Sequence, residues 1–543
     1  MRILPLLLAL LAVPAVGLPA ATSSRPNIIL LTVDSFRPDR LGCYGYQSAV
    51  TPNIDKLAAR GITFTNAFST ASWTNASLVS LLTGLYPPVH GVQRRGQSIP
   101  PGLVTPTEQL RQAGWLVPQV NYMFPMPNYA NLGFTPNRHL HLPEFMAEYA
   151  DTTFLAWYHF HGPHLPYNPP EKWLNRFLPE GVDTSSVSGI ASSVVMPHGE
   201  KEFSREQQRV ISALYDAEVA AQDEELGEVI AAIDSLGLFE NSIVILTADH
   251  GEELFEHGWV GHASTSLAGT LFDELVRIPL IICLPGSERE GRRVESLVQA
   301  VDIIPTVFEY LGIEPEATVQ GQLLPEVLAG KSYPPVREHL FFETSTCGYQ
   351  CPDGVELTWL RAVRTRHWKL LQRREPGELP DYSLYNLRTD PAETTDVAGS
   401  NSEELARLKG VLAAQIFANQ AALHQQNKQA DAAAADPAAI TINEPVEIIF
   451  PGQGDTLAHP DDDGSITVNW SGPPKAAYRI EYEVGTGKYH LTGSLIVRGN
   501  SQTYGPFTRM FWRAFPQYNP WHFRVVPAGN PDQASPWRTF SFR

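Results

Sequence analysis

Residues 26–35, PNIILLTVDS, form an unbroken apolar run that ends in the carboxylate of Asp34. A strand that helices cover on both faces has this composition, because neither of its faces meets water. Similar runs follow at residues 152–164, 241–253 and 277–286. Stretches of helical period lie between and after them, at residues 51–61, 204–237 and 301–313. Strands that alternate with helices predict an α/β fold, with a large, mostly parallel sheet sandwiched by helices.

Polar side chains follow three of these apolar runs. Asp34 ends the first, His164 ends the second, and Asp249 with His250 ends the third. Ligands of open α/β sheets bind beyond the carboxyl ends of the strands, so we expect these side chains to share one site. Two carboxylates and an imidazole suit one divalent metal ion, which would be Mn, Mg, Ca or Zn.

The bulk composition narrows the class of protein. The 543 residues include 40 Lys and Arg against 58 Asp and Glu, a net charge of −18. This balance argues against a nucleic-acid-binding protein, which normally presents a basic face. Residues 1–21 have a positive start, an apolar run and small residues, the pattern of a cleaved signal peptide. A membrane anchor is disfavoured because the run is short and contains prolines. We expect a secreted or periplasmic protein.

The second half of the chain changes character. Residues 25–334 carry the α/β pattern, and residues 335–425 predict a smaller antiparallel subdomain that ends in an amphipathic helix. Residues 426–441 are polar and alanine-rich and predict a linker. Residues 442–543 predict an all-β sandwich of the fibronectin type III or immunoglobulin kind. Its aromatic residues favour core packing, with a carbohydrate or surface contact as the alternative.

Two cysteines, Cys347 and Cys351, stand close together in a loop-like stretch. In an exported protein they either form a local disulfide or remain free thiols. With four cysteines in all, the chain is not a disulfide scaffold.

Motifs in order along residues 25–400 resemble the sulfatase family, within the alkaline phosphatase superfamily of metal-dependent hydrolases. They include PNIILLTVDSFRPDRLGCYGY, HFHGPHLPYNPP, IVILTADHGEELFEHGWVGH and LYNLRTDPAETTDVA. The resemblance implies an alkaline-phosphatase-like fold and an enzyme that cleaves sulfuric or phosphoric esters with a metal ion.

The resemblance also assigns roles to particular residues. Asp34 matches the first metal-binding aspartate, and Asp249 with His250 matches the second metal-binding pair. His164 matches the histidine that holds the ester and assists the leaving group. His262 occupies the place where sulfatases usually have a lysine, and an imidazole there can still bind the anion or protonate a leaving oxygen.

The stretch SWTNASLVSLLTG, residues 72–84, departs from the sulfatase pattern. Thr74 stands where the cysteine or serine precursor of formylglycine is expected, so formylglycine cannot form. Ala76 replaces the motif's proline and Leu78 its arginine. Ser35 replaces a further metal-binding aspartate, and Arg95 stands where an asparagine is expected.

The site residues that this sequence does contain resemble those of phosphoglycerol transferases and phosphodiesterases of the same superfamily, in which threonine is the nucleophile. That likeness gives one metal ion four ligands: Asp34, Thr74, Asp249 and His250. Metal coordination lowers the pKa of a hydroxyl and holds it in line for attack. Arg94 or Arg95 could supply the missing anion contacts, since a guanidinium fork matches a tetrahedral oxyanion. The alternative for these two arginines is an exposed pair of charges.

Three hypotheses follow for the function. The first is an exported, metal-dependent hydrolase or transferase in which Thr74 attacks a phosphate-type or sulfate-type ester. The missing formylglycine motif favours phosphorus esters as its substrates. The second hypothesis is a sulfatase that works without formylglycine. The third hypothesis is a catalytically silent binding protein, which the retained metal-ligand set disfavours. The substrate would be an ester of a small molecule, a glycan or a lipid head group.

Overall fold

The structure is a computed structural model that describes most of the chain after residue 24. The described residues are 25–94, 97–99, 103–124, 126–129, 131–139, 141–178, 182, 184, 187, 202–262, 270–286, 291–316, 319–328, 337–346, 356–434, 445–457, 466–472, 477–484, 491–498, 501–504, 519–527 and 531–543. The predicted signal peptide, Arg95 and the pair Cys347–Cys351 lie outside them.

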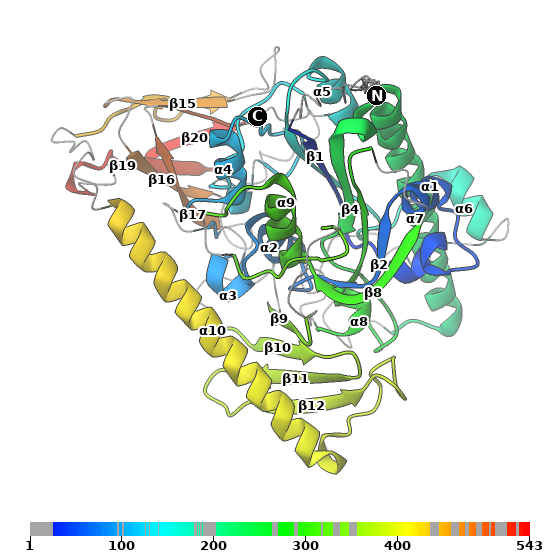
Figure 1. Cartoon of the computed structure of the whole chain (residues 1–543). Helices are drawn as coiled ribbons and strands as arrows, with labels where there is room; N and C mark the ends of the chain where they lie inside the picture. The colour runs from blue at the N-terminus through cyan, green and yellow to red at the C-terminus, as the bar shows by residue number, and fades with distance from the viewer. Residues whose placement is uncertain are drawn as a thin grey trace, which may run out of the picture.

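A six-stranded sheet forms the centre of the molecule (Figure 1). In spatial order its strands are β3 (Leu155–Phe160), β1 (Asn27–Val33), β4 (Ser242–Ala248), β7 (Arg277–Cys283), β2 (Ile62–Phe68) and β8 (Arg292–Gln299). β1 pairs in parallel with β3 and β4, and β2 pairs in parallel with β8. The predicted α/β fold with a mostly parallel sheet is therefore confirmed.

One strand corrects the prediction, because β7 runs antiparallel to both β4 and β2. A parallel neighbour would need a crossover that returns the chain to the opposite edge of the sheet. The described part of the connection from β4 to β7 holds β5 (Glu253–Leu254), β6 (Val260–Gly261) and α8 (Asp273–Val276). All three elements are short, and β7 starts at the end of the sheet where β4 stops.

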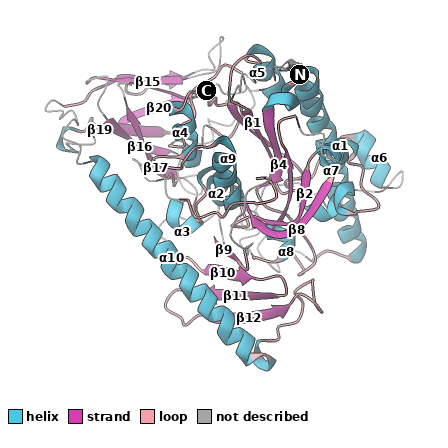
Figure 2. Cartoon of the chain, in the orientation of Figure 1, coloured by secondary structure: helices cyan, strands magenta, loops and turns pink. Residues whose placement is uncertain are grey.

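Helices cover both faces of the sheet (Figures 1 and 2). α1 (Pro52–Arg60) and α7 (Arg205–Ser235) lie on one face, and α2 (Thr74–Thr83) and α9 (Ile303–Leu311) lie on the other. Ser204 and Gln207 start α7 with a reciprocal capping box. Shorter helices complete the layers: α3 (Pro87–His90), α4 (Pro106–Gln112), α5 (Leu142–Glu148) and α6 (Glu171–Phe177).

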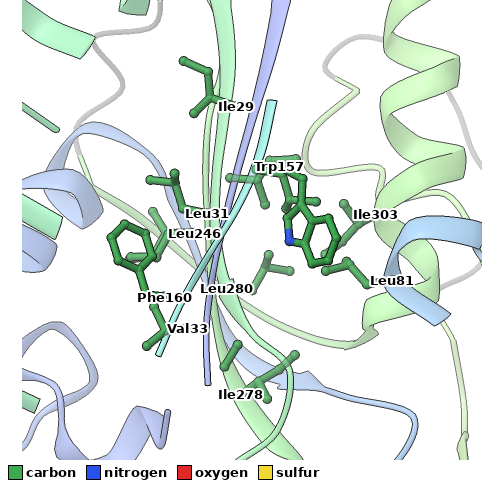
Figure 3. Close-up of a cluster of buried hydrophobic side chains, with 14 of the residues drawn as sticks. Ile29, Leu31, Val33, Leu81, Trp157, Phe160, Leu246, Ile278, Leu280 and Ile303 are labelled. Atoms are coloured by element: carbon green, nitrogen blue, oxygen red, sulfur yellow. The ribbon is translucent and has the colours of Figure 1, made fainter. Parts of the chain in front are cut away.

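The core fills the space between these layers. All seven residues of β1 are buried, as the apolar run predicts. Figure 3 shows Trp157 of β3 beside Leu81 of α2 and Ile303 of α9, while Phe160 lies across the strands from them. Each fully buried side chain of this size stabilises the fold by about 1.5–3 kcal/mol. Trp157 also donates its indole N–H to Thr32 Oγ1 at 2.9 Å, which satisfies its polar atom.

A four-stranded antiparallel sheet follows, in the order β12 (Asp381–Asn386), β11 (Trp368–Arg374), β10 (Trp359–Arg364) and β9 (Leu340–Ser345). The long helix α10 (Ser402–Ala434) packs on it through Leu408 and Leu412. α10 continues to Ala434, into residues 426–441 that composition assigns to a linker. Alanine has the highest helix propensity, so the start of that stretch extends the helix and is not irregular.

The C-terminal region forms two small sheets. One contains β13 (Ile448–Phe450), β15 (Ile466–Trp470) and β18 (Ser501–Tyr504); the other contains β14 (Thr456–Leu457), β20 (Arg538–Phe542), β19 (Trp521–Pro527), β16 (Ala477–Val484) and β17 (Leu491–Arg498). Trp470, Tyr478, Phe523 and Phe540 are buried in one cluster. Core packing accounts for these four aromatic residues. Among the described residues of the whole chain, no helix has the length and apolar character needed to span a membrane.

Candidate active site

Asp34, Asp249 and His250 meet at the carboxyl ends of two neighbouring parallel strands. The register pairs Val33 of β1 with Ala248 of β4, so the next residue on each strand is an aspartate. His250 Nε2 lies 3.7 Å from Asp34 Oδ1 and 3.4 Å from Asp249 Oδ2. All three side chains are buried. The structure thus brings together the three predicted metal ligands that follow strands.

Thr74 reaches the same point from the amino end of α2. Its Oγ1 lies 3.3 Å from His250 Nε2. Thr74 is only partly buried, whereas every later residue of α2 is buried, so α2 meets the accessible side of the site at Thr74. The Ser69 and Ser77 hydroxyls both donate to the Ala71 carbonyl, at 2.7 and 2.9 Å, and fix the turn before the helix. The partial positive charge of a helix amino end favours an alkoxide or a bound anion there.

The His250 ring is oriented by the backbone. Its Nδ1 lies 2.7 Å from the Gly251 carbonyl, to which an N–H at Nδ1 donates, so Nε2 presents its lone pair to the carboxylates and Thr74. Burial, with His262 nearby, lowers the pKa of His250 to about 3, so the ring is neutral at neutral pH. Gly251 permits this turn, since a Cβ there would lie 2.0 Å from the Glu274 carbonyl oxygen.

His159 is a residue that the sequence reasoning missed. Its Nε2 lies 3.6 Å from Asp34 Oδ2, and its Nδ1 lies 2.8 Å from Thr32 Oγ1. Ligand atoms of Asp34, His159 and Asp249 all lie within 4.8 Å of one another. The signal was present in the sequence: a histidine inside an apolar strand, which the parallel register places opposite Thr32 of β1.

The charges at this cluster fit a bound cation. Burial would raise the pKa of Asp34, but the imidazoles of His164, His159 and His250 outweigh burial and hold it well below its usual range. Burial and the charge of Asp34 raise the pKa of Asp249. Asp249 Oδ2 and His159 Nε2 are buried without a hydrogen-bond partner among the described residues. Two buried carboxylates side by side ionise together only when positive charge is supplied, and a divalent ion would supply it.

A second group of imidazoles borders the first. The His262 ring lies 4.4 Å from that of His250 and 4.9 Å from that of His164, centroid to centroid. Glu252 Oε1 lies 2.9 Å from His262 Nδ1 and fixes the ring orientation. Burial lowers the pKa of His262 to about 3 and raises that of Glu252 to about 8. Glu252 is a further residue that the sequence reasoning missed.

Ser35 occupies the place of the missing aspartate. It is buried, its φ is 55°, and its N–H donates to Asp249 Oδ1 at 3.1 Å. Its hydroxyl donates to Asp34 Oδ1 at 3.1 Å. Ser35 therefore orients both carboxylates. Gly162 lets the following loop, which carries His164, pass alongside, since a Cβ there would lie 2.2 Å from the Asp34 carbonyl oxygen.

The predicted arginines lie at the edge of what the structure describes. Arg94 lines a cavity together with Arg361 and Arg374 of the four-stranded sheet. Its carbonyl accepts a 3.4 Å hydrogen bond from Asn128, which also accepts one from Asn75, the residue after Thr74. Arg94 is therefore connected to the amino end of α2 by two hydrogen bonds. A contact between Arg94 or Arg95 and the ester itself stays a prediction.

Solved structures with this fold include a phosphonate monoester hydrolase of Agrobacterium radiobacter, with a TM-score of 0.60 and 23% identity over 74% of this chain and 96% of that one. Another is a complex with the substrate D-glucosamine-2-N,6-O-disulfate, with a TM-score of 0.55 and 19% identity over 76% of this chain and 99% of that one.

Characterised relatives cover much of the chain as well. An ulvan-active sulfatase of Formosa agariphila is 24% identical over 75% of this chain and 83% of its own length. Human arylsulfatase A is 27% identical over 74% of this chain and 89% of its own length. The family model Sulfatase matches residues 26–135 and 140–313, more than half of the 543 residues. The model N-sulphoglucosamine sulphohydrolase, C-terminal, matches residues 256–421. The chain therefore belongs to the sulfatase family of ester hydrolases.

Proposed function

We propose that this protein is an exported hydrolase or transferase of sulfate-type or phosphate-type esters that uses Thr74 as its nucleophile and one divalent metal ion. A single observation carries the proposal. Asp34, Asp249 and His250 converge with the hydroxyl of the partly buried Thr74 at the amino end of a buried helix. A protein that only binds a partner has no need for this constellation.

The metal ion would be held by Asp34, Asp249, His250 and Thr74, with His159 as a further candidate ligand. When bound, a divalent ion lowers the pKa of a coordinated hydroxyl and neutralises charge on the oxygens of the transferred group. The protein contributes orientation: the Gly251 carbonyl fixes the His250 ring, and Ser35 fixes both carboxylates. Mn, Mg, Ca and Zn all suit a site of carboxylates and imidazole.

Thr74 performs the first chemical step. Its hydroxyl proton leaves to solvent water, its oxygen attacks sulfur or phosphorus to form a new ester to Thr74, and the bond to the leaving alcohol breaks. The helix amino end stabilises the negative charge that develops on the transferred group. Water, or an acceptor alcohol, then cleaves the ester to Thr74 and regenerates the hydroxyl.

The imidazoles of His164 and His262 assist departure of the leaving group. His262 is neutral at neutral pH, because burial lowers its pKa to about 3, so we assign it a hydrogen-bonding role held in place by Glu252. We assign protonation of the leaving oxygen to His164, which is only partly buried. His164 Nδ1 contacts the Leu165 carbonyl, which leaves Nε2 for the substrate.

The substrate class rests on two kinds of relatives. The relatives named as an ulvan-active sulfatase and an N-acetylglucosamine-6-O-sulfatase favour a sulfate ester of a glycan. The threonine at the nucleophile position and the phosphonate monoester hydrolase of the same fold support phosphorus esters as a second candidate. We propose export because of the pattern in residues 1–21, and we retain 25–334, 335–425 and 442–543 as the proposed units of the chain.

The decisive experiment is turnover of matched aryl esters by the mature protein with each metal. The panel contains a sulfate, a phosphate monoester, a phosphodiester and a phosphonate monoester. We expect Thr74→Val, which keeps the shape but removes the hydroxyl, to lower kcat about a thousandfold or more, and Thr74→Ser to retain measurable activity. The fastest ester identifies the class. Full activity of Thr74→Val would refute the assignment of Thr74 as the nucleophile. A parent protein that cleaves none of the esters and binds none of the metals would support the silent binding protein.

A further inference from the structure

The turn after β1 orients both predicted metal-binding carboxylates and has an uncommon backbone conformation. Ser35 has a φ of 55°, in the left-handed region that residues other than glycine seldom adopt. In that conformation its N–H donates to Asp249 Oδ1 and its hydroxyl donates to Asp34 Oδ1, both at 3.1 Å. The next residue, Phe36, donates its N–H to the His250 carbonyl at 2.9 Å. A strained residue persists only where its surroundings hold it, so the groups that fix Ser35 also fix the two carboxylates.

The hydroxyl of Tyr215, on α7, holds this turn from outside it. It donates to the Ser35 carbonyl at 2.6 Å and accepts the Arg37 N–H at 3.0 Å. Tyr215 is buried, and its ring packs edge-on against that of Tyr167, with 5.7 Å between centroids. Burial raises the pKa of the Tyr215 hydroxyl well above its ordinary value, although the charge of Arg37 opposes this, so the group keeps its proton and remains a donor. One hydroxyl therefore binds both sides of the turn.

The side chain of Arg37 extends this contact to the loop after β4. Its guanidinium donates to the Glu252 carbonyl at 2.9 Å and pairs with Glu256 Oε1 at 2.7 Å. That loop begins with the ligand pair at residues 249–250. The two chain segments that carry the predicted metal ligands are therefore joined beside Tyr215.

We infer that Tyr215 is a positioning residue of the metal site: its hydroxyl holds the left-handed turn at Ser35, and through it the carboxylates of Asp34 and Asp249, in the arrangement that a divalent cation requires. The inference rests on the proposed function, because it concerns the same metal ion. Tyr215 acts through the backbone of Ser35 and is not itself a ligand. Its support is rigid, since α7 is a helix of 31 residues with a capping box at its start and lies on the central sheet (Figure 1).

Tyr215→Phe tests the hydroxyl and retains the ring. It leaves two backbone groups of the turn without this partner, so the turn is free to shift until they are satisfied. Tyr44→Phe is the matched control, since the Tyr44 hydroxyl also bridges backbone groups: it donates to the Phe64 carbonyl at 3.1 Å and accepts the Leu280 N–H at 2.8 Å. Those partners belong to β2 and β7 and not to the turn after β1.

Metal affinity is measured without any ester, so that the site is tested apart from turnover. Mn²⁺, Mg²⁺, Ca²⁺ and Zn²⁺ are each titrated by calorimetry into the metal-free parent, and the ion that binds most tightly is then titrated into both variants. We expect Tyr215→Phe to bind this ion about tenfold more weakly, the lower end of the loss that follows when a group that orients metal ligands is removed. Tyr44→Phe should bind it within about twofold of the parent, because its hydroxyl shares no partner with the site.

The outcomes separate this inference from the proposed function. A Tyr215→Phe protein with the metal affinity of the parent overturns the inference, and so do equal losses of affinity in Tyr215→Phe and Tyr44→Phe, which would reflect stability alone. A Tyr215→Phe chain that does not fold also overturns it, because the hydroxyl would then support the whole fold. In these cases the parent still binds its ion, and the proposed function is untouched. A parent that binds none of the four ions overturns the inference together with the metal ion of the proposed function, whereas turnover of the aryl esters decides the role of Thr74.

Discussion

Two clusters of histidine and carboxylate side chains follow β4 in the chain or contact the residues that do, and they balance their charges in opposite ways. The catalytic cluster consists of Asp34, Asp249 and His250. The clamp cluster consists of Glu253, His257 and Glu274, whose ligand atoms also lie within 4.8 Å of one another. Residue types alone would assign a metal ion to both.

The clamp cluster supplies its own positive charge. His257 Nδ1 lies 2.5 Å from Glu274 Oε1 and 3.2 Å from Glu253 Oε1. Its ring stacks on Phe272, with 3.6 Å between centroids and 9° between planes. Burial would lower the pKa of His257, but the two carboxylates outweigh burial and raise it to about 10. His257 is thus an imidazolium at neutral pH and occupies the place that a metal ion would take.

The catalytic cluster lacks such a cation. His250 is neutral there at neutral pH, because burial lowers its pKa to about 3. We therefore propose that charge balance separates a cluster that binds an ion from one that does not. The ring nitrogen of His250 that faces its carboxylates carries a lone pair, whereas the nitrogen of His257 that faces its carboxylates carries a proton.

The largest expected effect is loss of metal and activity in Asp249→Asn. Removing one of two adjacent carboxylates removes both a ligand and the negative charge that attracts the ion. We expect metal content to fall from near one equivalent to background, measured by elemental analysis of dialysed protein. kcat should fall about a thousandfold or more.

Glu253→Gln is the matched control in the clamp cluster, since it also removes one buried carboxylate charge. We expect it to retain near one equivalent of metal and activity within about tenfold of the parent. Loss of a second equivalent in Glu253→Gln would show that the clamp cluster binds metal, which would contradict the comparison.

Removal of the metal by a chelator should have the next largest effect. A ligand that binds only the native state at a hundred to a thousand times its Kd stabilises it by about 3–4 kcal/mol. We therefore expect a chelator to lower the denaturant midpoint of the parent and to abolish its activity. Asp249→Asn should already unfold at the lower denaturant midpoint without chelator. A further fall in its midpoint on chelation would point to a second metal site.

The fold was largely predictable from the sequence for a physical reason. β1 and β4 are fully buried and β3 nearly so, so their composition shows no alternation and identifies them as parallel strands that helices cover on both faces. The direction of β7 was not predictable, because an apolar run carries no information about which neighbour the strand pairs with. The length of α10 was missed because composition separates a linker from a polar helix poorly.

The site was predictable where it follows strand ends. Asp34, Asp249 and His250 are adjacent because parallel strands end at one edge of a sheet. His159 was missed because it lies inside its strand, where a buried histidine usually plays a structural part. Glu252 was missed because its contact with His262 depends on the path of the loop between them, and local sequence does not encode that path.

Glu252→Leu should have an intermediate effect. The carboxyl group fixes the His262 ring through Nδ1, and loss of such an orienting partner typically lowers activity 10- to 100-fold. We expect kcat to fall by that factor with metal content unchanged, which separates Glu252→Leu from Asp249→Asn. Activity equal to the parent would show that the His262 orientation does not matter for catalysis.

The smallest expected effect is the pH dependence of stability in His257→Gln. The native pKa of His257 is about 10, above the ordinary value of about 6.5, so the native state holds this proton more tightly than the unfolded state. The stabilisation is complete below pH of about 6.5 and is lost as the pH rises toward 10. We expect the parent's denaturant midpoint to fall between pH 7 and pH 10, and that of His257→Gln to start lower and fall less. His424→Gln, at an exposed position of α10, is the control and should follow the parent. If the parent and His257→Gln lose stability in parallel across this range, His257 is not the cation that balances Glu253 and Glu274.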